Sequence, residues 1–256
     1  MQRSPGLVRA YRMIAPLMDP RHIWRGLTGY PRYLAELSRY RRLQQSMGHA
    51  SFELHPCLHE RTSTTGFDPH YTYLSYWATS QLEQLDEEQA HVDVGSHLSW
   101  VMAVAARRKV VFIDIRPFDS HVPSVEVRAG SILALPFEDQ SIRSLSCLHV
   151  AEHIGLGRYG DQLDPAGTRR AVAELARTLA SGGNLLFALP VGRERICFNA
   201  HRVHRPSTIV RYFAEAGLAL RQFSAVDDQR IYHANADLMD YEDADYACGM
   251  FVFTRP

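Results

Sequence analysis

From His91 to the C-terminus, short apolar runs alternate with segments of helical periodicity, and few folds accommodate that alternation. Buried strands that alternate with helices form βαβ units, in which helices cover both faces of a mainly parallel sheet. We therefore predict an α/β domain around a mainly parallel seven-stranded sheet, whose last two strands pair as a long hairpin. The expected strands are 91–95, 109–115, 124–130, 143–150, 182–190, 218–226 and 247–254, and the expected helices are 98–107, 166–180 and 206–216.

The first 50 residues differ in character, because nine arginines stand against only Asp19 and Glu36. This segment has a net charge of +7 in a chain that is neutral overall, so the other residues sum to −7. Residues 31–47 show helical spacing after a proline suited to a first turn, and an irregular stretch follows. We expect a basic helical extension and linker over 1–65, and the α/β domain over 66–256.

Several classes of protein are not expected. No apolar run approaches the ~18 to 20 residues of a membrane span, and the N-terminus lacks a signal-peptide core, so we expect a cytoplasmic protein. The cysteines lack CxxC spacing, which argues against a disulfide framework and a thiolate zinc site. Nucleic acid is a poor candidate partner because the body of the chain is acidic. Homo-oligomerisation stays open.

Residues 1–50 have two interpretations. Their arginines and apolar side chains form a helical layer that packs on the acidic domain, or they rest peripherally on the inner face of an anionic membrane. The residues expected to contact such a membrane, besides the arginines, are Ile14, Leu17, Ile23, Trp24 and Leu27.

A candidate nucleoside site lies at the end of the first expected strand, where ligands bind in open α/β sheets. Gly95 follows Asp93 and Val94, and a glycine permits a sharp turn and the close approach of a ligand. Asp114 ends the next strand, 21 residues after Asp93. An acid about 20 residues after a glycine turn is typical of ribose binding. A simple tight turn is the alternative interpretation.

With the elements that follow, this pattern resembles the class I S-adenosylmethionine-dependent methyltransferases, which have a Rossmann-like fold. The resemblance covers roughly 91–256 and rests on 91–96, Asp114, 130–139, 141–154 and the Gly182-Gly183 pair. Segments 67–78, 148–161 and 198–206 also resemble DUF268, an uncharacterised bacterial family associated with polysaccharide gene clusters. The resemblance implies S-adenosyl-L-methionine as cofactor, and the residues expected to bind it are Asp93, Gly95, Ser96, Asp114, Ser131, Ile132 and His149.

Methyl transfer to a hydroxyl needs an in-line approach and often a base, and histidine suits that role near neutral pH. His153 is the first candidate, since it matches the histidine of the Glu-His-Ile element, and His149 and His201 are further candidates. Alternatively, His153 braces the following loop. The His149–His153 spacing also suggests zinc, but a catalytic site needs a third ligand and a positioned acid, so no metal is expected.

The segment after the fifth expected strand is dense in hydrogen-bond donors, as an anionic or polyhydroxylated substrate would require. Alternatively, the segment is a solvated basic loop paired with Glu194 or with the acidic stretch 240–245. Residues 158–161 form either a lid, since nearby glycines permit hinge motion, or a plain connector. A helix over 71–87 either packs its aromatic face in the core or covers the cleft, so that 68–71 reach the site. The expected substrate-binding residues are Arg195, Asn199, His201, Arg202 and Tyr159.

The leading hypothesis is an S-adenosylmethionine-dependent O-methyltransferase that acts on a saccharide or glycan precursor of cell-envelope polysaccharide. A second is a catalytically inactive methyltransferase-fold scaffold, because Gly95 alone remains of the usual glycine-rich turn. A third is a nucleotide-sugar oxidoreductase or epimerase, which shares the glycine turn and ribose acid. No TyrxxxLys pair supports this third hypothesis.

Overall fold

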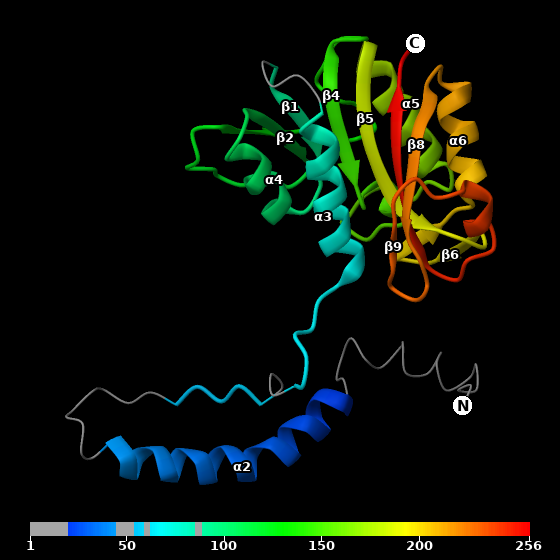
Figure 1. Ribbon diagram of the computed structural model, residues 1–256. Helices are drawn as coiled ribbons and strands as arrows, with labels where there is room; N and C mark the ends of the chain where they lie inside the picture. Colours follow the sequence, from blue (N-terminus) through cyan, green and yellow to red (C-terminus); the bar gives the residue numbers. More distant parts are fainter. Residues whose placement is uncertain (1–19, 45–53, 59–61, 85–88) are drawn as a thin grey trace. The chain divides into compact units, whose positions relative to one another are not determined.

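The computed structural model describes residues 20–44, 54–58, 62–84 and 89–256 (Figure 1). Contacts divide the chain into two compact units, Met1–Phe67 and Asp68–Pro256. The domain boundary predicted between residues 65 and 66 stays a prediction. Among the described residues, no helix is long and apolar enough to cross a membrane.

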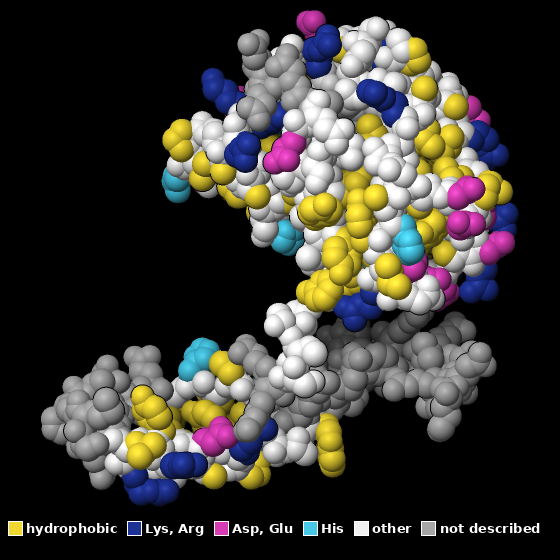
Figure 2. All heavy atoms as spheres, in the orientation of Figure 1, with side chains coloured by type: hydrophobic (Ala, Val, Ile, Leu, Met, Phe, Trp, Pro, Cys, Tyr) yellow, Lys and Arg dark blue, Asp and Glu magenta, His cyan; other side chains and the backbone are white. Residues whose placement is uncertain are grey.

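The first unit contains helix α2 (Pro20–Gln44). The predicted start at Pro31 was wrong, because apolar residues continue upstream at helical spacing and carry the helix through the proline. Ile14 and Leu17, two of the expected membrane-contacting residues, lie outside the described residues. Figure 2 shows hydrophobic side chains exposed along α2, and Ile23, Trp24 and Leu27 are among its exposed residues. Membrane contact through residues 1–50 stays a prediction.

The second unit is built on an eight-stranded sheet with the order β3-β2-β1-β4-β5-β10-β8-β9. The first five strands in this order are parallel, and β10 is antiparallel to both neighbours. The predicted count of seven was wrong by one, because β9 has only two residues and gives no periodic signal. The strands are β1 (His91–Val94), β2 (Val110–Asp114), β3 (Val125–Ala129), β4 (Ile142–Leu148), β5 (Leu179–Val191), β8 (Ala219–Val226), β9 (Tyr232–His233) and β10 (Ala247–Thr254).

Helices cover both faces of this sheet, and the core accordingly forms two clusters. One cluster packs Trp77 of α3 and Trp100 of α4 against the sheet, and the other packs Leu175 of α5 and Phe213 of α6 on the opposite face. The helices are α3 (Pro69–Leu82), α4 (Leu98–Ala105), α5 (Gly167–Thr178) and α6 (Pro206–Glu215), with short 3-10 turns η1 (Ala151–His153) and η2 (Leu238–Tyr241). A separate hairpin is formed by β6 (Arg195–Cys197) and β7 (His201–Val203).

Strand order reverses between β1 and β4, so the loops after β1, β2 and β4 open at one edge of the sheet. The loop after η1 contains Gly155 and Gly160, both with φ near +80°. A Cβ on Gly155 would overlap the backbone carbonyl of Asp164, whereas a Cβ on Gly160 would meet open space. The first glycine is therefore required by close packing, and the second only by its backbone angle.

We expect Gly155→Ala to lower the free energy of unfolding by about 3 kcal/mol or more, because it adds a clash with backbone to the left-handed penalty. Gly160→Ala is the matched control and should cost only about 1 to 2 kcal/mol. Urea denaturation of both variants measures the difference. Equal losses would show that the close packing at Gly155 contributes nothing.

Candidate functional site

Two open clefts adjoin at the carboxyl edge of the parallel strands. The first, of about 500 Å³, lies at the ends of β1, β2 and β4, and the second, of about 720 Å³, lies beside the start of α3. His149 and His153 line both clefts. The first is also lined by Gly95, Asp114, Gly130, Ile132, Arg116 and Tyr159, and the second by His70, Tyr71, Glu152, Arg158, His201 and Tyr246.

Two of the predicted cofactor-binding residues, Asp93 and Ser96, build the turn after β1 and do not line the first cleft. The Asp93 carboxylate is fully buried, accepts the Ser96 N–H at 3.0 Å and accepts the hydroxyl of Ser146 on β4. Burial raises the pKa of Asp93 to about 6, although the hydrogen bonds oppose that shift. The Ser96 hydroxyl accepts the Leu148 N–H at 3.1 Å. Both side chains thus fix the backbone that presents Gly95.

Gly95 and Asp114 face each other across the floor of the first cleft. Gly95 has φ +68°, and a Cβ placed on it would lie 3.2 Å from Val150 and 3.7 Å from Asp114 Oδ2. Asp114 Oδ1 accepts the Arg116 N–H at 2.7 Å, which holds the carboxylate in place. Within the described part of the chain, Oδ2 accepts no protein hydrogen bond. The geometry leaves this oxygen available to a ligand.

The loop after β3 forms the apolar side of the first cleft. Ile132, a predicted cofactor-binding residue, lines the cleft and is buried. Its neighbour Ser131 does not line it, because the Ser131 hydroxyl accepts the Leu133 N–H at 3.1 Å and closes the loop on itself. Of the two predicted contacts in this loop, the structure therefore brings only Ile132 to the cleft.

The position of His153, in η1, is compatible with both interpretations of the sequence, a base and a brace for the following loop. Its Nδ1 lies 2.6 Å from the carbonyl oxygen of Ala200, which only accepts, and 3.3 Å from the Arg158 guanidinium, which only donates. The shorter contact, with the carbonyl, favours the tautomer that carries its proton on Nδ1. Nε2 then holds a lone pair between the two clefts, 3.7 Å from Glu152 Oε1. The hydrogen bond to Ala200 braces the loop, and the same bond leaves the other nitrogen able to accept a proton.

His149 is held between a carboxylate and a thiol. Its Nδ1 lies 2.9 Å from Glu152 Oε1 and its Nε2 lies 3.4 Å from Cys248 Sγ, and all three side chains are buried. Burial by itself lowers the pKa of His149, but Cys248 and Glu152 outweigh it and raise the pKa well above its usual value. Both ring nitrogens of His149 thus face protein groups.

The predicted substrate-binding residues divide into two groups. Tyr159 lines the first cleft and His201, on β7, lines the second. Arg195 instead lies 3.9 Å from Asp245, so it pairs with the acidic stretch as the alternative interpretation expected. Arg202 is buried and donates to the carbonyls of Ile154 and Asp164, and Asn199 donates to the carbonyl of Leu156 at 3.4 Å. Arg195, Asn199 and Arg202 do not line either cleft.

Sequence reasoning missed three residues that line the clefts and a buried thiol that contacts His149. Cys248 was expected only as a buried thiol, and Arg116, Glu152 and Tyr246 had no assigned role. The segment 68–71 was expected to reach the site in one interpretation, and it lines the second cleft. Asp68 caps α3 by accepting the His70 N–H at 2.9 Å, and this cap fixes the position of the His70 ring at the cleft.

Solved structures of the same fold are similar to 70–74% of this chain. They include a putative sarcosine dimethylglycine methyltransferase from Galdieria sulphuraria (13% identity, 83% of that chain, 70% of this one, TM-score 0.53). The N-methyltransferase NodS from Bradyrhizobium japonicum WM9, solved with S-adenosyl-l-homocysteine, is 15% identical over 74% of this chain and 89% of its own (TM-score 0.52). The [4+2]-cyclase SpnF is 16% identical over 71% and 81% (TM-score 0.52).

These similarities show the fold: the second unit has the Rossmann-like α/β fold of class I methyltransferases, as the sequence predicted. A family model described as "Caenorhabditis protein of unknown function, DUF268" matches residues 138–242, which is less than half of the chain. That description does not support the expected association with bacterial polysaccharide genes. No curated protein matches the sequence.

We expect Arg202→Gln to destabilise the fold by about 3 kcal/mol, because it removes a buried charged donor from two part-buried carbonyls. Arg195→Gln is the control from the neighbouring hairpin strand, and its exposed ion pair should contribute less than about 1 kcal/mol. Chemical denaturation of the two variants tests this assignment. It is contradicted if Arg202→Gln leaves stability unchanged and instead weakens only ligand binding.

Proposed function

We propose that the protein is an S-adenosylmethionine-dependent methyltransferase. The observation that carries the proposal is the free Oδ2 of Asp114 beside the Gly95 turn, in a cleft with an apolar side at Ile132. A carboxylate there suits the two hydroxyls of a ribose, and a cleft with an apolar side and a few polar groups is typical of small-molecule sites. The residues present therefore fit a nucleoside cofactor.

In this proposal three residues of the first cleft bind the cofactor. Asp114 accepts the ribose hydroxyls, Gly95 lets the backbone approach the ligand, and Ile132 packs against the adenine. S-adenosylmethionine, when bound, supplies a methyl group on a sulfonium. NodS, which was solved with S-adenosyl-l-homocysteine, supports the assignment of the cofactor through its shared fold.

His153 is the proposed general base. In the tautomer that the short contact with Ala200 favours, Nδ1 carries the proton, and Nε2 is the atom that accepts the proton of an acceptor hydroxyl. Its place on the wall shared by the two clefts supports this role, since the acceptor must reach the methyl group from the opposite side.

The acceptor is proposed to be a saccharide or glycan precursor that enters the second cleft. That cleft offers an Arg158 guanidinium and the His201 imidazole, and aromatic surfaces at Tyr71 and Tyr246. Donors beside flat apolar rings suit a polyhydroxylated ligand. A role in cell-envelope polysaccharide assembly remains part of this proposal.

Calorimetric titration with S-adenosylhomocysteine tests the cofactor. We expect binding to the full chain, and Asp114→Asn should weaken it about 10- to 100-fold, because hydrogen bonds to a charged acceptor contribute about 1.5 to 3 kcal/mol. Asp119→Asn, at an exposed acid outside both clefts, is the control and should bind as the unchanged protein does. No binding by folded protein would favour the scaffold hypothesis, and preference for NAD would favour an oxidoreductase.

Transfer of a labelled methyl group to a panel of sugar nucleotides and oligosaccharides tests the base. His153→Gln should lower the rate about 10²- to 10⁴-fold while the affinity for S-adenosylhomocysteine changes little. His121→Gln, at an exposed histidine outside both clefts, should keep the full rate. An unchanged rate in His153→Gln would reject His153 as the base.

A further inference from the structure

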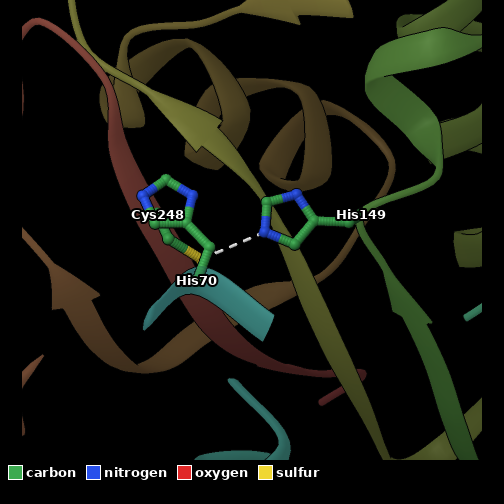
Figure 3. Close-up of side chains that lie close together, drawn as sticks. All are labelled: His70, His149 and Cys248. Atoms are coloured by element: carbon green, nitrogen blue, oxygen red, sulfur yellow. Dashed lines mark hydrogen bonds between the residues drawn. The ribbon is translucent and has the colours of Figure 1, made fainter. Parts of the chain in front are cut away.

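Three side chains from distant parts of the sequence meet beside the second cleft. His70 lies in the first turn of α3, His149 follows β4, and Cys248 belongs to β10 (Figure 3). One ligand atom from each lies within 4.8 Å of the other two. Figure 3 shows Nε2 of His149 directed at the sulfur of Cys248.

The orientation of His149 is set by its backbone and by a carboxylate. His149 has φ +58°, a left-handed conformation that is uncommon outside glycine and is often found at functional sites. Glu152 Oε1 lies 2.9 Å from Nδ1, so the carboxylate holds one ring nitrogen while the other faces Cys248. A carboxylate behind an imidazole in this way is the usual partner of a metal-binding histidine.

Glu152 itself has an unexplained feature. It is 1% exposed, and its Oε2 has no hydrogen-bond partner within the described residues. Oε1 contacts His149 and His153, whereas a buried carboxylate oxygen without a partner, such as Oε2, is costly unless a cation lies near it. Glu152 also lines the second cleft, so a cation close to His149 would lie beside this charge.

The same three groups, Cys248, His149 and Glu152, also have the order of a cysteine nucleophile, its base and an orienting acid. Burial decides between the two interpretations. A nucleophilic sulfur must be open to its substrate, but Cys248 is fully buried and does not line either cleft. The His70 and His149 rings lie at the sulfur, and both line the second cleft. An ion can bind between these groups, whereas a substrate carbonyl has no path to the sulfur.

We propose that His70, His149 and Cys248 bind a Zn²⁺ ion. Zinc lies about 2.3 Å from sulfur and about 2.0 to 2.1 Å from nitrogen, so a tetrahedral ion separates these two ligands by about 3.5 Å. The observed distance between Sγ and Nε2 is 3.4 Å. The His70 ring now stacks on His149 at an interplanar angle of 14°, and binding requires it to turn out of that stack.

Three protein ligands leave the fourth position of the ion open, as in catalytic zinc sites. His70 and His149 place that position at the second cleft, where water or an oxygen of the acceptor would bind. The role toward the acceptor rests on the proposed methyl transfer, whereas the metal site itself does not.

Metal analysis of the purified full chain tests the proposal. After loading with zinc and desalting, we expect about one Zn²⁺ per chain, and Cys248→Ala should lower the affinity more than about 100-fold. Cys147→Ala, at the other fully buried cysteine, is the matched control and should bind zinc normally. Glu152→Gln should weaken binding about 10- to 100-fold, as substitutions behind a metal ligand do.

Cobalt substitution covers the case in which a variant folds poorly. The full chain loaded with Co²⁺ should show an absorption band from thiolate-to-metal charge transfer, which His70→Ala weakens and Cys248→Ala abolishes. Failure to retain zinc or cobalt, or equal zinc affinity in Cys248→Ala, would overturn the site. Rapid alkylation of Cys248 in metal-free, folded protein would support the nucleophile instead. Calorimetry with S-adenosylhomocysteine reports the cofactor cleft separately, so the two proposals can fail independently.

Discussion

The pairing of β1 with β2 on one side and β4 on the other is the constraint on which both clefts depend. The register sets Asp93 opposite Phe112 on β2 and opposite Ser146 on β4. Buried polar side chains join β1 to β4, since Asp93 accepts from Ser146 and His91 contacts Ser144 and Ser146, each at 2.8 Å. Such groups are tolerated in a core only when their hydrogen bonds are made, so they fix how the two strands meet. The loops after both strands are positioned by that junction.

The parts of the site that are local in sequence could be predicted. Gly95 follows β1 and Asp114 ends β2, both strands have clear apolar runs, and one βαβ unit sets the spacing between the two residues. The directions in which side chains point could not be predicted from the sequence. Arg202 and Arg195 were both expected to donate to the substrate, but Arg202 donates to backbone carbonyls and Arg195 pairs with Asp245. The meeting of His70, His149 and Cys248 depends on the order of β4, β5 and β10, which no spacing in the chain reveals.

The fold alone does not fix the reaction. The structures similar to this chain include the [4+2]-cyclase SpnF as well as methyltransferases, so one scaffold supports different chemistries. The polar side chains that line the two clefts distinguish between these reactions. The first cleft offers a carboxylate oxygen and an apolar side, which suits a nucleoside, and the second offers imidazoles and aromatic rings. His149 and His153 stand between them, so groups bound in the two clefts would meet at these histidines.

The loop over residues 154–164, which follows His153, is held by contacts at both of its ends. Arg202 binds both of its ends through the carbonyls of Ile154 and Asp164, and Gly155 packs against the Asp164 backbone. The Asp161 carboxylate accepts the Gly155 N–H at 2.6 Å, which ties the middle of the loop to its start. At the tip of the loop, a Cβ placed on Gly160, next to Tyr159, would meet open space. The tip is held as well, because the Asp161 carboxylate also accepts the Tyr159 N–H at 3.2 Å and the Tyr159 ring contacts His153 and Arg116. One carboxylate therefore ties both the start and the tip of the loop, and this keeps Tyr159 beside His153 at the wall of the first cleft.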